Sequence, residues 1–110
     1  MPHKVSQSIV DIAVYCAYEC EHCANESLGK MPECARLCID CAQMCWNSAS
    51  YMSRGSRFIP QVVQACIEMC EACASECEKY QDNSHCQKCA EACRRAAEEY
   101  RNIVKVAAVA

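Results

Sequence analysis

The feature that most constrains this chain is a run of regularly spaced cysteines between positions 66 and 77. They are separated by four, three and four positions: Cys66, Cys70, Cys73 and Cys77. Side chains three and four positions apart lie on one face of an α-helix, and nothing in the run breaks a helix. The spacing recurs at Cys34, Cys38, Cys41 and Cys45. The pattern predicts helices with a cysteine stripe where a coiled coil would carry leucine or isoleucine.

The rest of the chain divides into four helical segments joined by short turns. Gly29 with Pro32, and Gly55, mark the first two breaks. The pattern favours an all-α fold, an antiparallel up-down-up-down four-helix bundle with a cysteine-lined core, in which residues 1–110 form one domain. The tail at 106–110 is predicted to fray. The predicted helices run from after Pro2 to about Ser27, from Pro32 to Met52, from Phe58 to Tyr80, and from the turn at 82–84 to about Val104.

The cysteines are concentrated in one half of the predicted bundle. They occupy the C-terminal halves of the first and third helices and the N-terminal halves of the second and fourth, which meet at one end of an antiparallel bundle. A shift of 50 positions superposes Cys16 on Cys66, and a shift of 48 superposes Cys38 on Cys86, so the chain reads as a repeated hairpin. The opposite half is predicted to be lined by Val5, Ile9, Ala13, Met52, Ile59, Val62, Val63, Ala96, Tyr100 and Ile103.

The composition excludes several classes of partner. A net charge of −3 and a pI near 5.6 argue against a nucleic-acid partner or a polybasic membrane contact. No apolar run reads as a membrane span or an export signal, so we expect a cytoplasmic protein without a membrane partner. In that setting fourteen cysteines indicate metal binding rather than a disulfide scaffold. No Ser/His/Asp or paired-carboxylate arrangement indicates an enzyme.

Three chemistries compete for the thiols. A disulfide-stapled or thiol-redox interaction protein is one, and a zinc protein using Cys-x2-Cys pairs is another, although each Zn(Cys)4 unit would bury two negative charges. Cu(I) is selected by thiolates, and one ion per thiolate leaves the cluster near neutral. This reasoning favours many Cu(I) ions and leaves the alternatives open. The candidate ligands are Cys16, Cys20, Cys23, Cys34, Cys38, Cys41, Cys45, Cys66, Cys70, Cys73, Cys77, Cys86, Cys89 and Cys93.

Five segments together carry a resemblance to a known family. They are Cys20-Glu-His-Cys23, Cys38-Ile-Asp-Cys41, Ser53-Arg-Gly-Ser56, Cys70-Glu-Ala-Cys73-Ala-Ser-Glu-Cys77 and His85-Cys-Gln-Lys-Cys-Ala-Glu-Ala-Cys93-Arg. Through them the chain resembles the bacterial four-helix-bundle copper storage proteins, cytosolic branch. The resemblance implies a homotetramer that holds multiple Cu(I) ions, roughly one per cysteine, for storage or detoxification. Relatives often carry more cysteines where this chain has Ala13, Ala96 and Tyr100, so we expect a lower capacity.

Further residues at the ends and on the outside complete the prediction. His85, His22 and Met31 fall at the loop end of the cysteine stripe, where family analogy places His or Met ligands, so they are candidate metal ligands. Met44 and Met69 read as packing residues, and Met52 and Tyr100 as closing the hydrophobic end. The aromatic residues off the stripe indicate a subunit interface; they are Tyr15, Tyr18, Trp46 and Tyr51.

Overall fold

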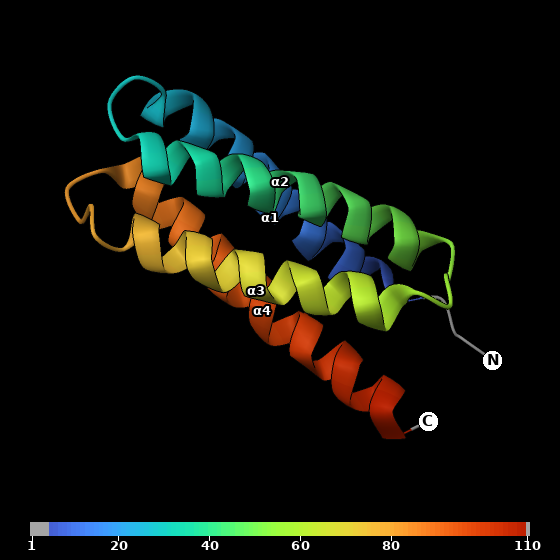
Figure 1. Cartoon of the computed structure of the whole chain (residues 1–110). Helices are drawn as coiled ribbons and strands as arrows, with labels where there is room; N and C mark the ends of the chain where they lie inside the picture. The colour runs from blue at the N-terminus through green and yellow to red at the C-terminus, as the bar shows by residue number, and fades with distance from the viewer. Residues whose placement is uncertain (1–4, 110) are drawn as a thin grey trace.

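The computed structural model describes residues 5–109 of the chain, and side chains as far as residue 106. Within that part the chain forms four α-helices: α1 (Gln7–Ser27), α2 (Pro32–Ser53), α3 (Ile59–Cys77) and α4 (Ser84–Val109). α1 and α3 each pack against both α2 and α4. The α1–α2 and α3–α4 loops lie together at one end, here called the loop end, and the α2–α3 turn lies at the other (Figure 1). The predicted four-helix bundle is confirmed.

The turns form where the sequence places its helix-breaking residues. Pro32 and Pro60 occupy the first turns of α2 and α3, where the missing N–H is not needed for an intrahelical bond. Gly29 and Gly55 adopt φ values of 78° and 64°, in the left-handed region that glycine enters at low cost. These residues explain why the first two predicted breaks are correct.

Two helix ends differ from the prediction. The third helix ends at Cys77 rather than Tyr80, because the N–H groups of Lys79 and Tyr80 bond to carbonyls three residues back and wind the chain into turns. The fourth helix continues to Val109, so the prediction of a frayed tail is wrong for its described part.

The predicted start of the first helix and the end of the C-terminal tail can be compared with the structure only in part. The first helix begins at Gln7 in the structure. Its predicted start after Pro2 lies among residues outside the described part of the chain, and so does Ala110 at the end of the tail.

The interior has the two halves that the sequence predicts. Every cysteine side chain is 0% exposed. In the hydrophobic half Ala13, Met52, Val63, Ala96 and Tyr100 are equally inaccessible. Partly buried side chains pack around this core: Val5, Ile9, Met44, Met69 and Ile103. Because the core contains ordinary hydrophobic packing as well as thiols, the fold does not depend on sulfur contacts alone.

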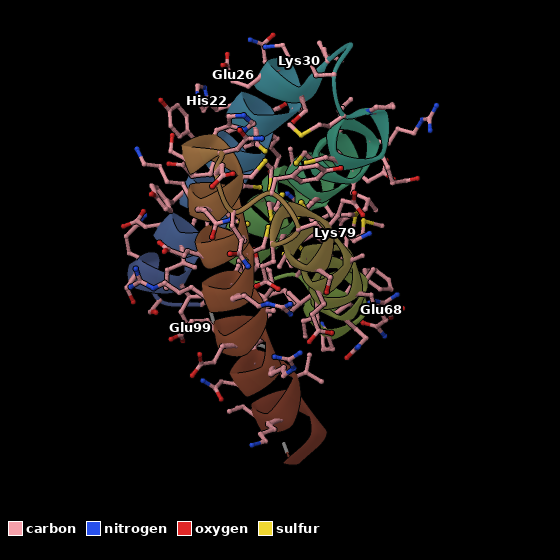
Figure 2. All side chains as sticks on the ribbon, turned by 90° about the vertical axis from the view of Figure 1, so that its left-hand side faces the viewer. His22, Glu26, Lys30, Glu68, Lys79 and Glu99 are labelled. Carbon is pink, nitrogen blue, oxygen red and sulfur yellow. The ribbon has the colours of Figure 1, made fainter. Side chains whose placement is uncertain are left out.

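Charged side chains cover the outside of the bundle (Figure 2). Arg94 pairs with Glu78 at 2.8 Å and Lys79 with Glu76 at 2.9 Å. Ion pairs at the surface contribute little to stability and do not determine the fold. None of the described helices combines the length and hydrophobicity needed to span a membrane.

Large aromatic side chains are also exposed on the outside. Tyr15, Tyr18 and Trp46 are 50%, 62% and 40% exposed, as expected for residues off the cysteine stripe. Tyr51, by contrast, is partly buried against the core. The predicted subunit interface stays a prediction.

Candidate metal centre

The cysteine stripes of the four helices face one another at distances suited to a shared ion. Neighbouring Sγ atoms approach as closely as 3.5 Å for Cys41 and Cys70, and several other pairs lie near 4 Å, such as Cys66 and Cys70 at 4.0 Å. A disulfide bond would need about 2.05 Å, and all fourteen cysteines are free. Two thiolates bound to one trigonal ion at about 2.3 Å would stand just under about 4 Å apart. The sulfur atoms are therefore spaced as ligands of one ion rather than as disulfide partners.

The thiols form a continuous series of groups along the bundle. Each group contains four Sγ atoms that all lie within 4.8 Å of one another, and consecutive groups share at least one cysteine. An ion bound to one group would thus have a bridging ligand to the next. From the loop end inward the groups are Cys23/Cys34/Cys77/Cys86, Cys23/Cys38/Cys77/Cys89, Cys20/Cys73/Cys89/Cys93, Cys16/Cys20/Cys41/Cys93 and Cys16/Cys41/Cys45/Cys70.

A histidine joins the thiols at the loop end. The Nδ1 atom of His85 lies 3.4 Å from Cys23 Sγ and 3.6 Å from Cys86 Sγ. The side chain is half-buried, whereas both cysteines are fully buried. His85 follows the α3–α4 turn as the second residue of α4, which places its ring over the last thiols of the series. Of the three candidates at the loop end, it is the one that the structure brings into contact with sulfur.

The other two candidates flank this position. His22 is exposed, and its ring makes an edge contact with that of His85 at a centroid distance of 6.5 Å. The Sδ atom of Met31 accepts a hydrogen bond from Asn83 Nδ2 at 3.6 Å, which ties the two loops together. Both residues border the loop end of the series.

A buried serine is the residue that the sequence interpretation missed. Ser27 is 0% exposed, and its hydroxyl donates a hydrogen bond to Cys34 Sγ at 3.7 Å and lies 3.9 Å from Cys23 Sγ. A signal for it exists in the sequence, because the shift of 50 positions superposes Ser27 on Cys77. Ser27 occupies a position where the repeat carries a cysteine.

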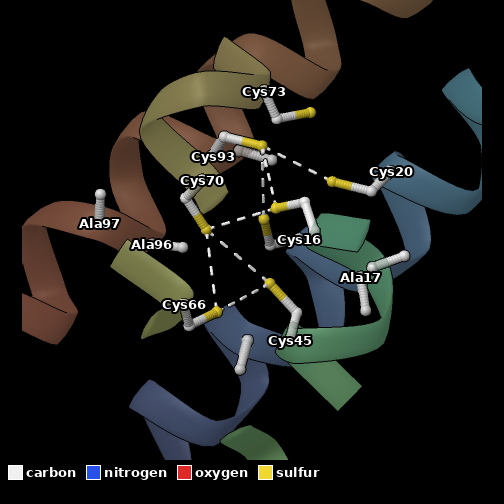
Figure 3. Close-up of a cluster of buried hydrophobic side chains, with 14 of the residues drawn as sticks. Cys16, Ala17, Cys20, Cys45, Cys66, Cys70, Cys73, Cys93, Ala96 and Ala97 are labelled. Carbon is white, nitrogen blue, oxygen red and sulfur yellow. Dashed lines mark hydrogen bonds between the residues drawn. The ribbon is translucent and has the colours of Figure 1, made fainter. Parts of the chain in front are cut away.

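Three thiols form a triangle at the opposite end of the series, here called the inner end. Cys45 Sγ lies 3.6 Å from Cys66 Sγ and 3.9 Å from Cys70 Sγ, and 4.0 Å separates Cys66 from Cys70 (Figure 3). Tyr100 donates a hydrogen bond from its hydroxyl to Cys45 Sγ at 3.8 Å. Ser48, one turn beyond Cys45 on α2, is 0% exposed, and its Oγ has no hydrogen-bond partner. Two hydroxyl groups therefore border this triangle.

Hydrogen bonds between neighbouring thiols shift their acidity in opposite directions. Hydrogen bonding with Cys45 and then Cys70 lowers the pKa of Cys66 to about 5. Hydrogen bonding with Cys16 and further thiols raises the pKa of Cys45. In this pair, the Cys66 thiolate accepts a hydrogen bond, while its neighbour Cys45 keeps its proton.

For Cys34 and Cys86 at the loop end, burial has the larger effect on acidity. It raises the pKa of Cys34, which hydrogen bonding from Ser27 partly offsets. Burial likewise raises the pKa of Cys86. Because a metal ion replaces thiol protons, binding at these residues releases protons and depends on pH.

Comparison with known proteins identifies this arrangement. The family model described as copper storage protein matches residues 2–105 of the chain. Among solved structures, the chain is similar to the Cu(I)-bound copper storage protein BsCsp3, at 33% sequence identity and a TM-score of 0.84, over 90% of this chain and 97% of that chain. No curated protein matches the chain at a significant level. Because the family match spans nearly the whole bundle, the chain belongs to the copper storage protein family.

Proposed function

We propose that this chain stores Cu(I), with its fourteen cysteine thiolates as the ligands and roughly one ion per cysteine. One observation carries the proposal: the thiols form an unbroken series of four-sulfur groups in which every cysteine side chain is 0% exposed. Cu(I) is selected by thiolates, and a series of this length supports capacity rather than a single electron-transfer or chaperone site. The similarity to a Cu(I)-bound storage protein supports the same ion here.

Charge favours a monovalent ion in this interior. The five four-membered groups consist of thiols alone, and the cationic side chains of the ion pairs Arg94–Glu78 and Lys79–Glu76 lie on the outside. One Cu(I) per thiolate leaves the series neutral, whereas five Zn²⁺ ions shared among the thirteen thiolates of these groups would leave three negative charges uncompensated. A row of such zinc sites would be costly to bury.

The loop end supplies the route for copper under this proposal. His85 contacts the last thiols of the series and is half-buried, so it has access both to solvent and to Cys23 and Cys86. His22 and Met31 border the same opening. We assign His85 as a ligand for ions that are entering or leaving, and the other two as accessory ligands.

The chemistry of the thiols indicates the cellular compartment and the role of the protein. Fourteen free thiols suit a reducing compartment such as the cytoplasm. Ions held by fully buried thiolates have no open position for a substrate, which supports storage or detoxification rather than catalysis. The exposed aromatic side chains Tyr15, Tyr18 and Trp46 support a subunit interface. The family resemblance implies a homotetramer, with residues 1–110 as the storage domain of each subunit.

An oxygen-free titration of the metal-free protein with Cu(I), against a competing chelator, tests the proposal. We expect uptake of roughly ten or more ions per chain with an affinity greater than that of the chelator. Metal analysis of protein from copper-fed cells should find the same stoichiometry. A parallel titration with Zn²⁺, followed by Cu(I) challenge, serves as the control.

Two results would contradict storage of Cu(I). Saturation at one or two ions would assign most of the thiols to another purpose. Retention of zinc in the presence of Cu(I) would favour a zinc protein.

A further inference from the structure

Cys66 differs from the other cysteines in its position within the series. Among the described side chains it is the one thiol outside the five four-sulfur groups. Its sulfur contacts are to Cys45 and Cys70, which both belong to the last of those groups. In a loaded series Cys45 and Cys70 would bridge two ions, whereas Cys66 would bind a single ion at the inner end.

The geometry of the three thiols suits a single three-coordinate ion. The sides of the triangle measure 3.6, 3.9 and 4.0 Å. A point equidistant from its corners lies about 2.2 Å from each sulfur, close to the ~2.3 Å of a metal–thiolate bond. The ligands would therefore bind an ion in their plane without rearrangement.

The Ser48 hydroxyl has no hydrogen-bond partner and lies on the same helix as Cys45. Ser48 is fully buried, and its Oγ has no hydrogen-bond partner although a buried polar group normally finds one. It stands one turn from Cys45 among the buried residues of α2. The Tyr100 hydroxyl, also fully buried, already donates to Cys45.

We propose that Cys45, Cys66 and Cys70 form a three-coordinate site for one monovalent soft ion at the inner end, with Ser48 and Tyr100 as its positioning residues. The inference rests on the proposed function. When the ion is bound, the Ser48 hydroxyl donates to the Cys66 thiolate and gains the partner that it lacks in the metal-free protein.

The negative charge on the thiolates explains why hydroxyl groups are needed at the inner end. A thiolate that binds one ion retains more negative charge than a thiolate that bridges two. At the loop end His85 lies beside such a thiolate, whereas the sulfur contacts of the buried Cys66 are to Cys45 and Cys70. A hydrogen bond to a charged acceptor is stronger than one between neutral groups, so the two hydroxyls replace the missing water.

Substitutions of the hydroxyls in the full-length chain test the site. Ser48→Ala and Tyr100→Phe each remove one hydroxyl, and Ser50→Ala and Tyr18→Phe are matched controls at exposed positions. We expect each test variant to release one Cu(I) per chain at a chelator concentration about ten- to a hundredfold lower than wild type requires. The controls should retain copper as wild type does.

Thermal unfolding separates this role from a purely structural one. Because Ser48 lacks a partner without metal, metal-free Ser48→Ala should melt at or above the wild-type temperature, while its copper-loaded form melts below loaded wild type. In a Cys66→Ala background, which lacks the site, neither test substitution should change copper release.

Several outcomes would overturn the inference. They are unchanged copper release in both variants, the same effect in the Cys66→Ala background, or an equal loss of thermal stability with and without copper in Ser48→Ala. Wild-type protein that takes up only one or two ions would instead overturn the proposed storage function, and the inference with it.

Discussion

The Nδ1 atom of His85 lies 3.4 Å from the Sγ atom of Cys23, although the two residues belong to different helical hairpins. This contact places an imidazole nitrogen over the thiols at the loop end, where the side chain still has access to solvent. Under the proposed function, an ion arriving from solvent meets this nitrogen before it reaches the buried thiols.

Replacing His85 should therefore affect copper transfer rather than capacity. We expect His85→Ala to slow Cu(I) release to a chelator or uptake from a donor complex by about tenfold, because the nitrogen that would hold the ion in transit is lost. Stopped-flow absorbance measures the rate. His22→Ala should have a smaller effect, since His22 contacts His85 rather than sulfur. Lys88→Ala, at an exposed position on α4, is the control and should leave the rate unchanged. Equal rates for His85→Ala and wild type would refute the transfer role.

Removing two thiols from the series should lower capacity without unfolding the bundle. Cys70→Ala with Cys73→Ala removes a ligand from two different four-sulfur groups, so we expect the loss of a few ions per chain. Each truncation should cost about 1–2 kcal/mol of stability, because both side chains are fully buried. Cu(I) titration and circular dichroism measure the two effects, with Glu68→Ala, an exposed position on α3, as control. Unchanged capacity would show that these thiols are not ligands.

Metal-free protein should remain helical. The hydrophobic half, which includes Val63 and Met52, packs without any ion, so the far-ultraviolet circular dichroism spectrum should keep its helical shape after copper is removed. Loading should raise the melting temperature, since the ions bind the folded state. A random-coil spectrum without metal would contradict this expectation.

All fourteen thiols should react as free thiols when the protein is prepared without oxygen. The structure has every cysteine free, with no pair closer than the 3.5 Å between Cys41 and Cys70. Counting thiols in denaturant after anaerobic lysis measures this directly. A count near zero would favour the disulfide-stapled alternative.

The serine on the cysteine stripe of α1 should be convertible into a ligand. Ser27→Cys places a thiol where the repeat carries Cys77, next to Cys23 and Cys34. We expect capacity to rise by about one ion, as for a ligand added to a thiolate site. Ala17→Cys, on the same helix but outside the cysteine stripe, should not raise it. Equal gains in the two variants would mean that added sulfur binds regardless of position.

The sequence was sufficient to predict the helices and the buried stripe because both depend on local spacing. Cysteines three and four positions apart must share a helix face, and Gly29, Pro32 and Gly55 interrupt the helices wherever the pattern is placed. Burial of all fourteen thiols followed from that face being the interior one.

The contacts between helices could not be predicted in this way. Which thiol meets which depends on the axial offset of the helices, which packing and the loops determine together. The direction of the His85 ring toward Cys23 depends on the turn before α4. The roles of Ser27 and Ser48 were also hidden, because serine on a buried stripe signals function only once its hydroxyl is seen beside sulfur or without a partner.

The sulfur-lined half ends beside the half-buried His85 at the loop end, while the fully buried Tyr100 and Met52 cover its inner end. Under the proposed function, copper ions leave the bundle first from its loop end. Ions beside His85 would exchange quickly, and an ion among Cys45, Cys66 and Cys70 would leave only after those ahead of it. A single molecule would therefore hold some ions that exchange rapidly and others that exchange slowly. Isotopic copper exchange would follow two distinct time courses.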